Sequence, residues 1–142
     1  MKIFYMNNNI KNKFCTYISM EMTDSGKTKL GYWKIRGLAS QIRYEMVYLG
    51  VDYEEVEYED RPAWLAVKDT MGMQFPNLPY LFDGDLKLSE PVAIMKYLAA
   101  KHGPSLLGDS PTEIAQVEMV ANQVRELQQA ITQKCYITGD RQ

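Results

Sequence analysis

The sequence predicts an α/β fold in which a small mixed sheet is covered by helices and followed by one long amphipathic helix. Strand-like and helix-like segments alternate between residues 29 and 103 in the order β-α-β-α-β-β-α. A β-α-β unit requires a parallel strand pair, whereas the later hairpin requires an antiparallel pair, so a mixed sheet is expected. After Pro111, apolar residues recur at steps of three and four as far as Cys135, which is the period of a helix.

Composition is that of an ordinary globular protein and excludes several functional classes. The chain has 142 residues, of which 46% are hydrophobic and 24% charged, with a formal net charge of −2. This charge gives no reason to expect a nucleic-acid partner. No apolar run approaches the roughly 20 residues of a membrane span, and Cys15 and Cys135 have neither the spacing of a metal site nor that of a disulfide framework. We therefore expect a cytoplasmic protein without metal or membrane association.

Residues 1–28 differ in character from the rest of the chain. They are polar, include three successive asparagines at positions 7–9, and show neither helical nor strand periodicity. We expect a disordered extension there. Met20 and Met22 are alternative starts of the folded protein, and the sequence leaves this choice open.

The first half of the folded region is predicted from strand propensity and helical spacing. Residues 29–33 form a short strand. A helix then runs to Gly50, a natural residue just past a helix end, because apolar residues recur at steps of four, four and three: Leu38, Ile42, Met46 and Leu49. Residues 53–58 have strand propensity. A short irregular helix follows over residues 61–70.

A stiff proline turn, Phe75-Pro76-Asn77-Leu78-Pro79, precedes the hairpin. Each proline lacks an N–H and biases the residue before it toward extended geometry. The turn is either a simple lead into an edge strand or a corner where Asn77 and Leu78 present backbone groups outward. Strands over residues 80–82 and 86–88 then flank an Asp-Gly-Asp turn, and Pro91 begins a helix that reaches Lys101.

The long helix begins at a capping box, Ser110-Pro111-Thr112-Glu113. Its apolar stripe has a near-heptad spacing and cannot be buried by the helix alone, so it needs a partner surface in this chain or another. The stripe consists of Ile114, Val117, Val120, Val124, Leu127, Ile131 and Cys135. The expected organisation is an extension over residues 1–28, a sheet domain over 29–103, a linker over 104–111 and a helical segment over 112–142.

Three separated motifs resemble the cytosolic glutathione transferases of the mu class, over about residues 30–136. They are Gly31-Tyr32-Trp33-Lys34-Ile35-Arg36-Gly37-Leu38-Ala39, Trp64 with Lys68, and Phe75-Pro76-Asn77-Leu78-Pro79-Tyr80-Leu81. The resemblance implies a thioredoxin-like N-terminal domain followed by an all-helical C-terminal domain. The sequence matches only the first long helix of that second domain, so a C-terminally truncated member is expected.

The chemistry implied by the resemblance is attack of the glutathione thiolate on a small electrophile. A free thiol has a pKa of about 8.5, and lowering it by about two units requires roughly 2.7 kcal/mol in favour of the thiolate. Tyr32 matches the catalytic tyrosine and would donate a charge-assisted hydrogen bond worth about 1.5–3 kcal/mol. The helix that begins near Leu38 would point its positive end at the same sulfur. The alternative for Tyr32 is a strand residue that packs on the sheet.

By the same resemblance, seven further residues would bind glutathione. Trp33 and Leu38 would line the thiol end, and Trp64 with Lys68 would bind the glycine carboxylate. Leu78 would pair its backbone with the peptide, helped by Asn77, and Glu90 would reach the γ-glutamyl ammonium.

Pro91 departs from the family pattern, which usually has a serine at this position. It supplies neither the hydroxyl nor the N–H that would grip the γ-glutamyl carboxylate. The loss of two bonds to a charged group would cost on the order of 2–4 kcal/mol of binding.

Three residues matched by resemblance point beyond this site. Glu126 would reach glutathione bound to the other subunit of a homodimer, and Phe75 would enter a pocket of that subunit. Tyr136 would assist some electrophiles. The competing hypotheses are a truncated or degenerate homologue that acts as a non-catalytic interaction module, and an incomplete product without a stable fold.

Overall fold

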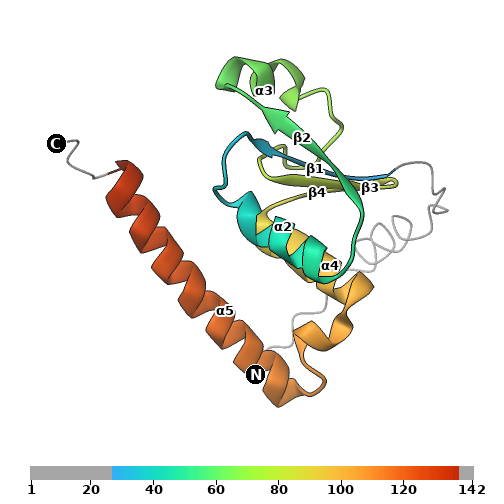
Figure 1. Ribbon diagram of the computed structural model, residues 1–142, viewed down its shortest axis with the longest axis vertical. Coiled ribbons are helices and arrows are strands. Elements are labelled where there is room, and N and C mark those ends of the chain that lie inside the picture. Colours follow the sequence, from blue (N-terminus) through green and yellow to red (C-terminus); the bar gives the residue numbers. More distant parts are fainter. Residues whose placement is uncertain (1–26, 138–142) are drawn as a thin grey trace, which may run out of the picture.

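The computed structural model describes residues 27–137, and its sheet and helices follow the predicted order (Figure 1). The disordered extension expected over residues 1–28 lies outside the described residues except for Lys27 and Thr28. The elements are β1 (Thr28–Trp33), α2 (Ala39–Tyr48), β2 (Tyr53–Tyr58), α3 (Arg61–Lys68), β3 (Tyr80–Asp83), β4 (Leu86–Ser89), α4 (Pro91–His102), the 3-10 helix η1 (Pro104–Leu107), α5 (Pro111–Thr132) and the π-helical turn η2 (Gln133–Ile137).

Within the described residues the strands form one four-stranded mixed sheet in the order β2-β1-β3-β4. β1 pairs in parallel with β2 and antiparallel with β3, and β3 pairs antiparallel with β4. The predicted α/β class is therefore confirmed. Parallel pairing of β1 and β2 follows from the helix that joins them, because the crossover returns the chain to the same end of the sheet.

The main core lies between the sheet and two helices, α2 and α4, which cover one face of it (Figure 1). Six fully buried side chains form this core: Leu30, Ile42, Met46, Leu81, Ile94 and Leu98. Burial of an aliphatic side chain contributes roughly 1.5–3 kcal/mol. α3 lies on the other side of the sheet (Figure 1). Of the predicted α2 stripe, Ile42 and Met46 are fully buried and Leu49 packs against this core. Leu38 is 40% exposed, because it precedes the helix instead of lying on its buried face.

Gly31 is required at the centre of β1, where it is paired with Tyr80 of β3. A Cβ atom at this position would lie 2.1 Å from the Tyr80 ring. The absence of a side chain lets the ring cross the strand, which is one of the reasons for glycine in a strand interior. The consequence is an aromatic surface over the middle of the sheet.

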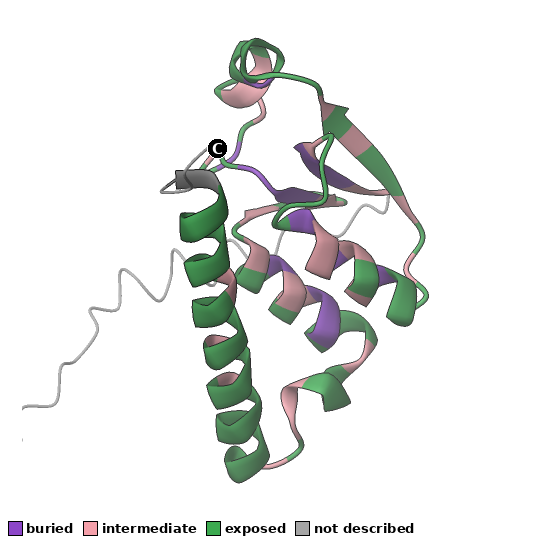
Figure 2. Cartoon of the chain, turned by 60° about the vertical axis from the view of Figure 1, so that its left-hand side comes forward, coloured by how far each residue is buried: buried purple, intermediate pink, exposed green. Residues whose placement is uncertain are grey.

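α5 runs beside the sheet domain and buries none of its residues 111–132 (Figure 2). Its start is capped as predicted, because Ser110 Oγ accepts from the Glu113 N–H at 3.2 Å. The apolar stripe is exposed, and the α-helix ends at Thr132, so Cys135 lies in η2. A groove of about 520 Å³ lies between α5 and the elements α2, α4 and η1, and Glu45 of α2 lines it.

Candidate functional site

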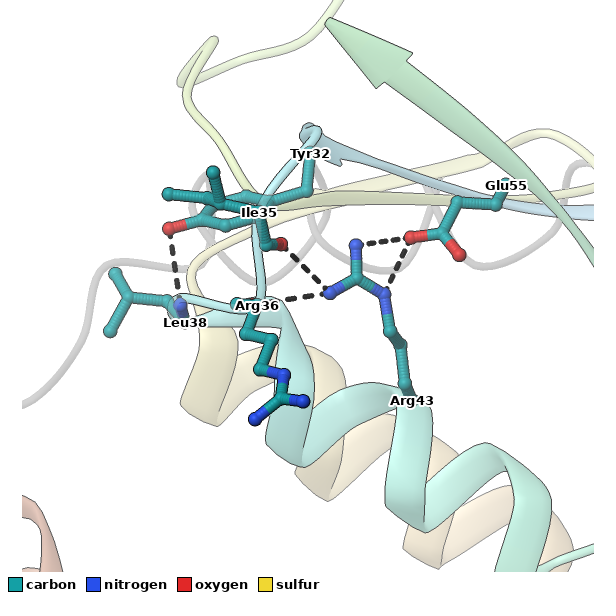
Figure 3. A network of polar contacts seen from close by, with 6 residues as sticks. All are labelled: Tyr32, Ile35, Arg36, Leu38, Arg43 and Glu55. Carbon is teal, nitrogen blue, oxygen red and sulfur yellow. Dashed lines mark hydrogen bonds and ion pairs between the residues drawn. The ribbon is translucent and has the colours of Figure 1, made fainter.

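The phenol of Tyr32 turns from the end of β1 toward the start of α2 (Figure 3). The Leu38 N–H donates to its oxygen at 3.1 Å. The Leu38 side chain makes no capping hydrogen bond at the start of α2, and the Tyr32 oxygen accepts a bond at the positive end of this helix instead. A phenol can accept and donate at once. Its own hydrogen has no acceptor among residues 27–137, which leaves it available to an anion.

Gly37 permits this close approach of the loop to the phenol. Its φ is +41°, in the left-handed region that favours glycine. A Cβ atom there would lie 2.7 Å from the Tyr32 oxygen. Tyr32 itself is only 6% exposed, so the ring is fixed by packing and the loop closes over its tip.

An aromatic cluster around Tyr32 joins strands β1, β2 and β3 to helices α2 and α3. Trp64 of α3 stacks on Tyr80 with ring centroids 6.2 Å apart, and it meets the edge of Tyr58 at 5.3 Å. The hydroxyls of Tyr58 and Tyr80 are 3.1 Å apart. Burial, and then the hydrogen bond with Tyr58, raise the pKa of Tyr80, so this phenol stays neutral. The cluster also includes Tyr32, Ala39, Met73 and Leu78, with Trp33 packed against it.

The predicted corner has a cis Leu78–Pro79 bond, and the Asn77 side chain forms a hydrogen bond within it. Asn77 Oδ1 accepts from the Leu78 N–H at 2.9 Å. Asn77 Nδ2 donates to Glu90 Oε1 at 3.1 Å. The Leu78 N–H, expected to face outward to a ligand, is therefore already bonded within the protein.

Glu90 and Pro91 lie at the start of α4. Glu90 has a φ of +74°, a conformation that a residue with a side chain rarely adopts. Pro91 occupies the first turn of α4, as predicted, and the Ile94 N–H donates to the Glu90 carbonyl at 3.0 Å. The hydrogen bond from Asn77 brings this helix start next to the proline corner.

Trp64 and Lys68 lie one helical turn apart in α3. Asp60 caps this helix by accepting from the Ala63 N–H at 2.9 Å. Trp64 is buried in the aromatic cluster, and Lys68 is half-buried and forms no ion pair within residues 27–137. A half-buried lysine without an ion pair in the described chain is available to a carboxylate.

The structure brings some of the predicted site residues together and leaves others apart. Tyr32, Trp64 and Leu78 share the aromatic cluster, and Asn77 contacts Glu90. Two further predicted residues, Phe75 and Glu126, are exposed and do not belong to this cluster. Tyr136 lies in η2, and its side chain is outside the described structure.

The comparisons with known proteins identify the family. A family model described as "Glutathione S-transferase, N-terminal domain" matches residues 28–100. The chain belongs to the glutathione S-transferase family. It is 46% identical over 110 residues to the class-mu 26 kDa isozyme 51 of Fasciola hepatica, covering 76% of this chain and 50% of that protein. It is 43% identical over 114 residues to glutathione S-transferase Mu 1 of Bos taurus, covering 75% and 51%.

These relatives confirm the mu-class resemblance drawn from the three motifs. The chain spans about half the length of the curated relatives it matches. Among solved structures, the glutathione S-transferase Blo t 8 superposes with a TM-score of 0.72 at 37% identity, covering 80% of this chain and 51% of that one. The thioredoxin-like N-terminal domain is thereby confirmed.

Sequence reasoning missed Tyr58 and Tyr80 as parts of the candidate site. Both were expected only as strand residues. The glycine inside β1 was a usable signal, because glycine in a strand interior often marks a close approach by another group. Tyr80 makes that approach to Gly31. Arg43, which contacts the loop after β1, was missed as well (Figure 3).

Residues 27–137 lack two kinds of feature. In this range, no helix combines the length and the apolar character needed to cross a bilayer. No group of three or more histidine, cysteine, aspartate or glutamate side chains in the same range is arranged to hold a metal ion.

Proposed function

We propose that this protein transfers glutathione to small electrophiles, with Tyr32 stabilising the thiolate. The observation that carries the proposal is the hydrogen bond from the Leu38 N–H to the Tyr32 oxygen at 3.1 Å. It fixes the phenol at the positive end of α2 while leaving its own hydrogen for the sulfur. In the reaction the thiolate sulfur forms a bond to an electrophilic carbon, and a leaving group departs or a proton is taken up.

The energy required matches what this arrangement supplies. A phenol that accepts a bond from an N–H becomes a better donor, because hydrogen bonds in a chain polarise one another. A bond to a charged acceptor is worth about 1.5–3 kcal/mol. Lowering the thiol pKa by about two units requires about 2.7 kcal/mol. Tyr32 with the start of α2 therefore suffices for a mostly ionised thiol at neutral pH.

The rest of glutathione would be held along the aromatic cluster. Trp64 and Lys68 would bind the glycine carboxylate by an indole N–H and a positive charge. Trp33 and Leu38 would line the thiol end. Because Asn77 Oδ1 accepts from the Leu78 N–H in the free protein, the peptide carbonyl of glutathione would have to replace it.

The γ-glutamyl end would be bound more weakly. Glu90 is available to the ammonium group, next to Asn77. Pro91 has no N–H and no hydroxyl for the carboxylate. We therefore expect weak glutathione binding at this end, although Pro91 is compatible with the first turn of α4.

We further propose a cytoplasmic homodimer. Phe75 is 70% exposed beside the corner, as expected of a residue that inserts into a partner subunit. Glu126 is exposed on α5, where it would reach glutathione of the other subunit. Tyr136 would assist the electrophile. The proposed division is a glutathione-binding domain over residues 29–103, a linker over 104–111 and a helical domain beginning at 112.

The test is to measure the pKa of the bound glutathione thiol from the ultraviolet absorbance of its thiolate. We expect a value near 6.5 for the full chain and a rise toward about 8.5 in Tyr32→Phe, the value of a free thiol. Conjugation of a small aryl halide should fall in parallel. Tyr44→Phe is the matched control, because Tyr44 is 70% exposed and lies on α2 away from the cluster. An unchanged thiol pKa in Tyr32→Phe contradicts the proposal.

The alternative is a non-catalytic module that binds glutathione weakly. Pro91 and the bonded Leu78 N–H are the observations in its favour. Retention on immobilised glutathione without conjugation or thiol ionisation would support this alternative over the enzyme.

A further inference from the structure

Arg43 of α2 contacts the loop that carries Leu38 (Figure 3). Its Nη1 donates to the carbonyl oxygens of Ile35 and Arg36, each at 3.1 Å. Its Nε donates to Glu55 Oε1 of β2 at 2.5 Å, and its other terminal nitrogen forms an ion pair with the same carboxylate. One side chain thus joins the loop, the second turn of α2 and the edge strand of the sheet.

The loop depends on such polar contacts because it is not held by packing. Residues 34–38 are all exposed and lie between β1 and α2 without regular structure. The Lys34 N–H donates to the Tyr58 carbonyl at 3.1 Å, which fixes the first residue of the loop. The contacts from Arg43 fix the next two residues, just before the chain reaches Leu38.

The Arg43 contacts act through geometry more than through charge. Glu55 pairs with the guanidinium and neutralises it, so little net field reaches the phenol. The guanidinium is a planar fork that can bond a carboxylate on one side and carbonyls on another, whereas the ammonium of lysine is a compact point charge. Lysine at this position would therefore keep the charge and lose the shape.

We propose that Arg43 is a positioning residue that sets the Leu38 N–H against the Tyr32 oxygen and thereby tunes the donor strength of the phenol. Its link to the bound thiol rests on the proposed function, whereas its control of the Leu38 N–H does not. Without Arg43 the loop carbonyls turn to water, the Leu38 N–H leaves the phenol more often, and the phenol stabilises an anion less well.

The test compares Arg43→Lys, Arg43→Gln and Glu55→Gln with the unaltered full chain. Lys34→Gln is the matched control, because it removes an exposed ion pair of the same loop, with Glu59, but leaves the Arg43 contacts intact. Two measurements are made on each protein: hydrogen exchange of the Leu38 amide without ligand, and the pKa of the bound glutathione thiol. Thermal unfolding reports whether each variant folds.

We expect Leu38 exchange at least about fivefold faster in both Arg43 variants, because the amide is opened more often. The bound thiol pKa should rise by about half a unit or more in both. Glu55→Gln should show a smaller effect of the same sign, and Lys34→Gln none. Arg43→Gln and Glu55→Gln keep the proposal testable if Arg43→Lys does not fold.

Wild-type exchange and wild-type thiol pKa in a folded Arg43→Lys protein would overturn the proposal. A lower unfolding temperature with neither of these changes would assign Arg43 a role in stability alone and would also overturn it. If the unaltered chain does not lower the thiol pKa, the proposed function fails. The exchange of the Leu38 amide then still decides whether Arg43 positions it.

Discussion

Asn77 donates to Glu90 at 3.1 Å and so joins the proline corner to the start of α4, across 13 positions of the sequence. The same amide accepts from the Leu78 N–H at 2.9 Å. Both bonds use groups that a bound peptide would otherwise meet. The corner is therefore preformed in the free protein, and ligand binding exchanges an internal partner for an external one.

Removing this amide should destabilise the corner. We expect Asn77→Ala to lower the free energy of unfolding by about 1 kcal/mol, because two partly exposed hydrogen bonds are lost. Urea unfolding measures the change. Asn77→Asp is the control, because its carboxylate can still accept from Leu78 but repels Glu90. If Asn77→Ala is as stable as the unaltered protein, the amide does not hold the corner.

Replacing Pro91 should strengthen glutathione binding. We expect Pro91→Ser to bind immobilised glutathione about 30-fold more tightly, because an N–H and a hydroxyl become available to a carboxylate, worth about 2–4 kcal/mol together. Pro91→Ala restores the N–H alone and should give an intermediate gain. Tight binding by the unaltered protein, with no change in Pro91→Ser, would refute this interpretation of the site.

Acid should unfold the protein partly through Asp83. Burial alone would raise the pKa of Asp83, but hydrogen bonds from Lys101 at 2.6 Å and Tyr97 at 2.5 Å outweigh it and lower the pKa. The unfolded state then binds the proton more tightly, so stability is full above the unfolded pKa near 3.9 and is lost as pH falls through the lower folded value. Asp83→Asn should remove most of this loss below pH 4, measured by urea unfolding at pH 7 and pH 3. An equal pH effect in both proteins would exclude Asp83 as its source.

Glu45 should make the protein less stable as pH rises, which is the opposite of the effect of Asp83. Burial raises its pKa to about 7, and its Oε2 is buried without a partner among the described residues. The charged groups that line the same groove are Lys96, Glu118 and Arg125, and Lys96 pairs with Glu118 at 2.7 Å.

The folded state therefore binds the Glu45 proton more tightly, so the stability from this group is full below pH 4 and is lost as pH rises toward 7. We expect Glu45→Gln to be more stable than the unaltered protein at pH 8 and to differ little at pH 4.5. Thermal unfolding at the two pH values measures this difference. If Glu45→Gln changes the unfolding temperature equally at both pH values, the titration of Glu45 does not contribute to the pH dependence of stability.

Gly31 should tolerate no side chain. We expect Gly31→Ala to lower the free energy of unfolding by about 1–3 kcal/mol, because the added methyl would lie 2.1 Å from the Tyr80 ring and overpack it. Gly50→Ala is the control for backbone strain, since Gly50 has a φ of +67° and no atom within 4 Å of an added Cβ. A smaller cost at Gly31 than at Gly50 would contradict the crowding.

Only those residues of the candidate site that stand in local sequence motifs could be predicted. Tyr32, Trp64 and Lys68 stand in motifs whose spacing is local, and the helix or strand around each was readable from the sequence. The bond between Asn77 and Glu90 was not, because it joins a turn to a helix start across the hairpin. The apolar stripe of α5 was readable from its spacing, and within residues 27–137 it is exposed.

The sequence by itself determined the order of the elements, the burial of Ile42 and Met46 on α2, and the family. These follow from local spacing: a period of 3.6 for helices, strand propensity between turns, and glycine or proline at the breaks. Only the tertiary structure decided that Leu38 bonds the phenol of Tyr32 and that Arg43 holds the loop between them. Those contacts depend on the distance between a strand end and a helix start, which packing sets and residue spacing does not encode.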